Sequence, residues 1–144
     1  GKASRIYQSE SVLSPVGWSA SGKELIIKSV AGASGASPFP VEVSLLQIAA
    51  DNPNASREIA RLKAAYFQNI AQSPDRRTIA FVTRTDGSDA VQIVSSAGGT
   101  AKTLTASNDV RVYFSSLSFA PDGKSVYYGK QANWQIISMI NNFK

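Results

Sequence analysis

The chain has 144 residues, 43% of them hydrophobic, with 15 Lys and Arg against 10 Asp and Glu and with no cysteine or histidine. This length and apolar content predict one folded domain over residues 1–144. The missing side chains exclude disulfides, thiolate or imidazole metal sites, cysteine nucleophiles and Ser-His-Asp triads.

The net charge of +5 permits an acidic partner. The basic residues are scattered, and their longest run is the pair Arg76-Arg77, which favours a solvated cationic surface over a nucleic-acid site. No segment reaches the roughly 18 apolar residues of a membrane span, so we expect no membrane insertion. Because the chain begins with Gly1-Lys2, we expect an excised or processed piece.

Three 18-residue boxes align without gaps, at residues 12–29, 66–83 and 113–130. Each box has an apolar position, then a tight-turn tetrapeptide, then an aliphatic or β-branched run. Spacings of this size are typical of propellers and other repeat arrays. The alternation after each turn predicts a β-hairpin in every box.

The turn of each box carries residues suited to a tight reversal of the chain. Proline presets a negative φ, aspartate accepts backbone N–H bonds, and glycine supplies a positive φ. Arg76 stands at the glycine position of the second box, where we expect either a relaxed backbone or left-handed strain. We interpret the aspartates as turn formers and not as paired catalytic carboxylates. The predicted turn residues are Gly22, Pro74, Asp75, Pro121, Asp122 and Gly123.

The segments between the boxes continue the β pattern. Asp86-Gly87 and Gly98-Gly99 are hairpin turns, so the second repeat is predicted to hold four short antiparallel strands, as one propeller blade does. Residues 54–65 contain helix formers and a plausible helix cap at Asn54. The repeat nevertheless requires an outer strand near residues 57–62, so we predict a strand there.

The third repeat has one strand fewer before the chain stops. Residues 5–8 at the N-terminus are predicted to supply its fourth strand, giving an all-β fold of three four-stranded antiparallel blades. Closed propellers hold about 4–8 blades, so three form a partial propeller. We expect two chains to form a six-bladed ring about a two-fold axis, or this chain to be the C-terminal part of a longer propeller. A small sandwich or barrel is the alternative fold.

Signals for chemistry are weak, whereas signals for binding are present. Residues 86–89 provide two aspartates but lack the other oxygen ligands of a calcium loop, so a hairpin turn is favoured and we expect no metal and no cofactor. Two aromatic pairs precede inner strands and have cations nearby, which suits a contact surface. Packing between blades is the alternative for these pairs, and Trp18, Phe119 and Trp134 are expected in the core. The candidate binding residues are Tyr66, Phe67, Arg111, Tyr113 and Phe114.

At Ser73-Pro74-Asp75-Arg76-Arg77 and at residues 120–124 the chain resembles the TolB-type, WD40-like β-propeller repeat. The resemblance extends over nearly the whole chain. It implies a non-catalytic module that binds a protein or peptide partner in the cell envelope of a bacterium, periplasmic or secreted. The alternative is a ligand-sensing or accessory propeller domain cut from a larger regulator or peptidase. Fold alone does not decide between them.

Overall fold

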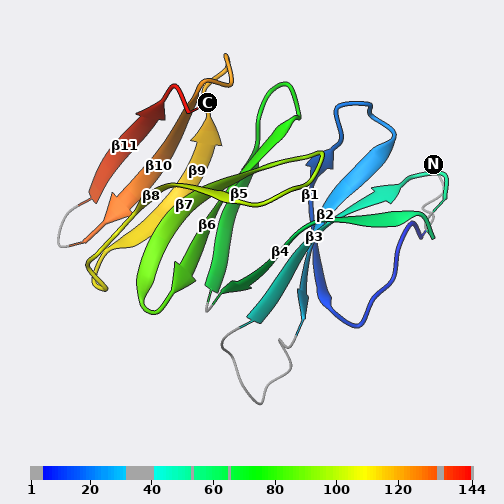
Figure 1. The fold of residues 1–144 in the computed structure, drawn as a ribbon, viewed down its shortest axis with the longest axis horizontal. Helices are drawn as coiled ribbons and strands as arrows, with labels where there is room; N and C mark the ends of the chain where they lie inside the picture. The colour runs from blue at the N-terminus through cyan, green and yellow to red at the C-terminus, as the bar shows by residue number, and fades with distance from the viewer. Residues whose placement is uncertain (1–4, 32–40, 53, 65, 133–134, 144) are drawn as a thin grey trace.

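The computed structural model describes residues 5–31, 41–52, 54–64, 66–132 and 135–143, and within these ranges it contains strands and no helix (Figure 1). The strands are β1 Val12–Trp18, β2 Glu24–Ala31, β3 Val41–Ala49, β4 Ser56–Ala64, β5 Tyr66–Gln72, β6 Thr78–Thr85, β7 Ser88–Ser95, β8 Lys102–Ala106, β9 Tyr113–Phe119, β10 Ser125–Gln131 and β11 Gln135–Asn141.

The strands form three antiparallel sheets in chain order. The sheets are β1-β2-β3-β4, β5-β6-β7-β8 and β9-β10-β11, and each box supplies the first two strands of its own sheet. The sheets stand side by side along the molecule and do not close into a ring (Figure 1). The predicted all-β partial propeller is therefore confirmed, in place of the sandwich or barrel.

The disputed segment near residue 60 is a strand. β4 pairs along its length with β3, and Ile59 and Ala60 are buried in the core between sheets. Helix propensity amounts to less than about 1 kcal/mol per residue, and burial against a neighbouring sheet outweighs it.

The predicted strand at residues 5–8 is wrong. These residues have no strand pairing, and they lie at the end of the array formed by the first sheet, whereas β11 lies at the opposite end (Figure 1). An N-terminal strand reaches the last blade only when the blades close into a ring, and three blades leave the ends apart. Among the described residues the third sheet therefore has three strands.

The three box turns share one backbone geometry. The residue with positive φ is Gly22 (73°), Arg76 (61°) and Gly123 (70°), and in each case its amide donates to the carbonyl three residues earlier. The side chain just before the positive-φ residue accepts a hydrogen bond from the amide just after it. Asp75 Oδ1 accepts from Arg77 N at 3.0 Å, and Asp122 Oδ1 accepts from Lys124 N at 2.9 Å.

The first strand of each sheet, β1, β5 or β9, also contains a β-bulge. Asn69 and Ser116 occupy the same box position, and both have positive φ, 46° and 51°. Pro15 stands at that position in the first box, and its ring locks φ near −65°. The bulge there moves to Val16, the next residue.

Two cores lie between the three sheets. Ile26, Val43 and Leu45 of the first sheet meet Ile79 and Phe81 of the second in one core. The other core joins the second and third sheets and contains Ala80, Val82, Val91, Phe114, Val126 and Tyr128. Sheets stacked through such cores are the blades of a propeller.

The expectation for the large aromatic residues was only partly met. Phe119 is half-buried against the second core, whereas Trp18 is 41% exposed and is not a core residue. Trp18 ends β1, the edge strand of the first sheet, and the described residues form no blade before that sheet. Trp134 lies outside the described residues.

Candidate functional site

A buried ion pair links the second sheet to the third. Arg84 and Asp89 face each other across the β6–β7 hairpin, with Arg84 Nη1 2.7 Å from Asp89 Oδ1 and side-chain exposures of 16% and 4%. Asp89 Oδ2 accepts the backbone N–H of Phe114 at 2.6 Å, and Arg84 Nη2 donates to the carbonyl of Val110 at 2.6 Å. The pair therefore holds both the loop before β9, at Val110, and the start of β9, at Phe114.

The loop at residues 107–112 is held by its own polar contacts. Ser107 N donates to the carbonyl of Asp89 at 2.8 Å, and Arg111 donates from Nε and Nη2 to the two carboxylate oxygens of Asp109 at 3.0 and 2.9 Å. Hydrogen bonds from the Arg111 side chain and backbone lower the pKa of Asp109 to about 2. Because this folded-state pKa is depressed, the stabilisation is present above the unfolded pKa near 4 and is lost as pH falls toward 2.

Beside the Arg84–Asp89 pair, a small group of exposed side chains lies at the start of β9. Tyr113 is 51% exposed, and the Arg84 guanidinium lies over its ring, 4.2 Å from the centroid. Val110 is 55% exposed, and the Arg111 side chain is 80% exposed. We call Val110, Arg111 and Tyr113 the rim surface. The rim surface combines an apolar side chain, an aromatic ring and a cation, at the end of the loop and the start of β9. Arg84 holds this segment by its hydrogen bond to the carbonyl of Val110.

The structure brings together part of the predicted binding set. Tyr113 and Arg111 lie on the rim surface, but Phe114 is buried at 5% exposure and stacks against Tyr128 with ring centroids 4.9 Å apart, so it belongs to the core and not to a contact surface. Alternation along β9 turns neighbouring side chains to opposite faces, which separates Tyr113 from Phe114. The backbones of Tyr66 and Phe67 begin β5, with Tyr66 opposite Arg84 in the ladder, and their side chains lie outside the described residues.

Sequence reasoning missed the role of Arg84 and Asp89. In the sequence, Asp89 stands out only as a possible oxygen ligand beside Asp86. A readable signal existed, because opposite charges placed symmetrically around the Asp86-Gly87 turn predict a cross-strand pair.

Over the parts of the chain that the structure describes, no three acidic side chains gather in an arrangement that could hold a metal ion. The same ranges contain no helix of the length and apolarity needed to cross a membrane.

Solved structures show which fold these sheets belong to. An uncharacterized protein from Listeria monocytogenes EGD-e superposes with a TM-score of 0.72 at 10% identity, over 99% of this chain and 41% of its own. TolB from Acinetobacter baumannii superposes with a TM-score of 0.65 at 16% identity, over 94% of this chain and 31% of its own. The chain has a TolB-like β-propeller fold. No protein-family model and no curated protein matches its sequence.

The fold also occurs in enzymes. A puromycin hydrolase superposes with a TM-score of 0.68 at 17% identity, over 90% of this chain and 22% of its own. An oligogalacturonate lyase superposes with a TM-score of 0.67 at 13% identity, over 94% of this chain and 41% of its own. This TolB-like chain thus spans less than half the length of each of these proteins, and at such identities the likeness concerns the fold alone.

Proposed function

We propose that this TolB-like propeller module is non-catalytic and binds a protein or peptide partner through the rim surface. The observation that carries the proposal is the Tyr113 ring, which is half exposed although Arg84 holds one of its faces. Aromatic and arginine side chains provide much of the energy of protein interfaces, and a ring that is already fixed loses little entropy on binding.

The chemistry of the rim surface suggests what the partner brings. Val110 and Tyr113 offer apolar area, and Arg111, which is paired with Asp109, still exposes 80% of its side chain on a chain of net charge +5. A segment with an aromatic or aliphatic side chain next to a carboxylate matches both features. We expect apolar contact to provide most of the affinity, so binding should persist in salt.

A displayed peptide library selected on the purified chain tests this proposal. Peptides enriched at both about 50 mM and about 500 mM salt should bind the Tyr113→Ala variant at least about tenfold more weakly. Tyr127→Ala is the matched control, because it removes an exposed tyrosine from another face and should leave binding unchanged. Enrichment of no peptide, or equal binding by the Tyr113→Ala variant, would refute the proposal.

The location of the protein belongs to the same proposal. The likeness to TolB supports a periplasmic or secreted position in a bacterial cell envelope. Fractionation of cells expressing the full gene product, with immunodetection of this chain, checks it. Recovery in the cytoplasm alone would contradict an envelope location.

A second candidate is an accessory or sensing domain of a larger regulator or peptidase. It is favoured by the small share that this chain covers of puromycin hydrolase, 22%, and of an acylaminoacyl peptidase, 17%. The full-length gene product distinguishes the two functions, because a catalytic or DNA-binding domain in the same polypeptide would support the second.

A further inference from the structure

The third sheet has a free edge where the other two sheets have a fourth strand. β11 pairs with β10 on one side, and no strand among the described residues pairs with its other side. The equivalent strands β3 and β7 pair on that side with β4 and β8. Leu45, Val91 and Ile137 each pair with the same box position on the strand before. On their other side Leu45 lies opposite Ala60 and Val91 opposite Thr105, whereas Ile137 within the described ranges pairs with β10 alone.

Backbone hydrogen bonds show which amides of β11 face this edge. Asn142 N donates to the carbonyl of Lys124, which lies directly opposite in the register, at 3.0 Å. Antiparallel ladders alternate, so the amides of every second residue before Asn142 also point toward β10. The amides of Ile137, Met139 and Asn141 therefore point toward the free edge.

The first sheet shows what such an edge holds when it is paired. Ala49 has the repeat position of Asn141, and its amide donates to the carbonyl of Ala55 at 3.3 Å, just before β4 begins. β4 begins at Ser56, seven residues after β3 ends, and β8 begins at Lys102, also seven residues after β7 ends. In both complete sheets the strand on this edge is thus the next strand along the chain.

The edge of β11 lacks the features that protect an outermost strand. β4 contains four charged residues, and β8 is five residues long and begins with Lys102. β11 is seven residues long, carries no charge, and exposes Ile137 and Met139 by 82% and 49%. Natural sheets avoid long, uncharged, exposed edges because such edges pair with other strands. We therefore expect a strand to cover this edge.

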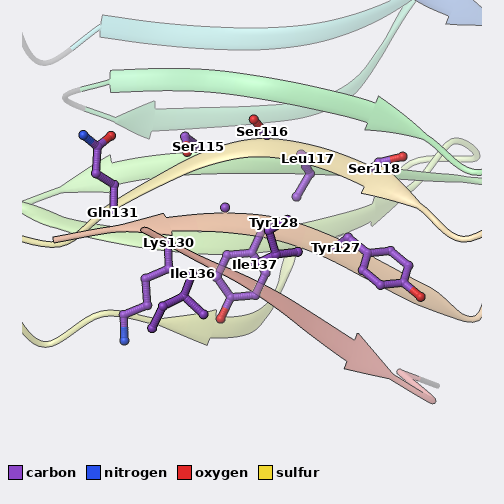
Figure 2. Close-up of a pocket in the computed structure, with 11 residues that line it drawn as sticks. Ser115, Ser116, Leu117, Ser118, Tyr127, Tyr128, Lys130, Gln131, Ile136 and Ile137 are labelled. Carbon is purple, nitrogen blue, oxygen red and sulfur yellow. The ribbon is translucent and has the colours of Figure 1, made fainter. Parts of the chain in front are cut away.

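The outer face of the same sheet is also uncovered. A pocket of about 630 Å³ opens there over β9, β10 and β11, with Tyr127 at one end and Lys130 at the other (Figure 2). Tyr127 and Ile137 are 39% and 82% exposed. Ala80 and Val91 hold these repeat positions in the second sheet, and both are 0% exposed in the core against the third sheet. Blades in an array contact only their neighbours, so the repeat assigns this face to a further blade.

We propose that the same gene product supplies a fourth strand that pairs with β11 and completes the third blade. The strand begins seven residues beyond Asn141, which is the spacing in the two complete sheets, and runs antiparallel to β11. The lengths of proteins with this fold support a continuation, because this chain spans 41% of the Listeria protein and 31% of TolB. The proposal does not depend on the rim surface.

Hydrogen exchange resolved to single amides, on this 144-residue chain and on the full gene product, tests the proposal. In the 144-residue chain the amides of Ile137 and Met139 should exchange at least about tenfold faster than those of Ser138 and Ile140, which point toward β10. In the full gene product the Ile137 and Met139 amides should slow by at least about tenfold. The Ser138 and Ile140 amides are the control, because β10 protects them in both proteins.

Two proline substitutions provide a second measurement. Proline has no N–H, and a strand tolerates it where that group would face an unpaired edge. Met139→Pro should therefore lower the unfolding midpoint of the 144-residue chain much less than Ser138→Pro, which removes a hydrogen bond to β10. In the full gene product the two losses should become comparable, because the amide of residue 139 then has a partner.

Four results would overturn the proposal. A gene product that ends at Lys144 has no strand to supply. Amides of Ile137 and Met139 that stay fast in the full gene product, or a Met139→Pro loss that is the same in both proteins, would leave the edge open. Protection of these amides that grows with the concentration of the 144-residue chain would assign the edge to a second molecule.

Discussion

Arg76 holds a backbone conformation that glycine provides in the other two boxes. Its φ of 61° lies in the left-handed region, which costs a residue with a Cβ about 1–2 kcal/mol. The surrounding turn keeps it there, since the Arg76 amide donates to the carbonyl of Ser73 at 2.8 Å and Asp75 accepts the following amide. Of the two outcomes considered from the sequence, the structure shows left-handed strain and not a relaxed turn.

We predict that Arg76→Gly stabilises the chain. Relief of the left-handed strain exceeds the extra unfolded-state entropy of glycine, so the free energy of unfolding should rise by about 0.5–1 kcal/mol. Chemical denaturation followed by tryptophan fluorescence measures it. Arg77→Gly is the control, because Arg77 is not among the described residues with positive φ, and it should be destabilising. Equal effects of the two substitutions would contradict the strain.

At the scale of strands and sheets, the Arg84–Asp89 pair acts as a clamp between β6, β7 and β9. Its polar groups satisfy one another in a nearly buried position, and the backbone of Phe114 depends on the same carboxylate. Removing one member leaves an uncompensated charge next to the second core, which is the costly way to break a buried pair.

We predict that Asp89→Asn destabilises the fold by about 3 kcal/mol, because the Arg84 guanidinium loses its counter-charge. The midpoint of thermal or chemical unfolding measures the loss. Asp86→Asn makes the same chemical change three residues earlier, at an exposed turn position with φ 50° that asparagine tolerates, and should stay within about 0.5 kcal/mol of wild type. Comparable losses in both variants would refute the clamp.

The elements that were predictable from the sequence are those with a local cause. Turn residues and alternating runs located the boxes, and the repeat correctly selected a strand over a helix at β4. The missing strand at residues 5–8 and the buried Phe114 were not predictable in this way, because each depends on how whole sheets meet. The shift of the first bulge to Val16 follows from Pro15 once the bulge is known, but composition alone does not reveal a bulge.

At the scale of the whole molecule, the sheets differ in how many neighbours they have. The second sheet lies between two others, and β6 sends Ile79 and Phe81 into one core and Ala80 and Val82 into the other. β10 sends Val126 and Tyr128 into one core, and its other face is open. Stability in repeat arrays is approximately the sum of such neighbour contacts.

We predict that amides in β6 exchange with solvent at least about tenfold more slowly than amides in β10, because opening β6 disrupts two cores. Hydrogen exchange followed by mass spectrometry, on the wild-type chain, measures the rates. The comparison is internally controlled, because both strands pair with a strand on each side. Identical protection would mean that the three sheets open as a single unit.

Ile27 and Ile48 lie on the face of the first sheet that points away from the second sheet, and both are buried, which restricts how copies of this array could stack. Stacking one chain on the next in a repeating head-to-tail order requires two different open ends, and such stacking yields fibres when it does not close. With Ile27 and Ile48 already shielded, growth in that direction has no starting point.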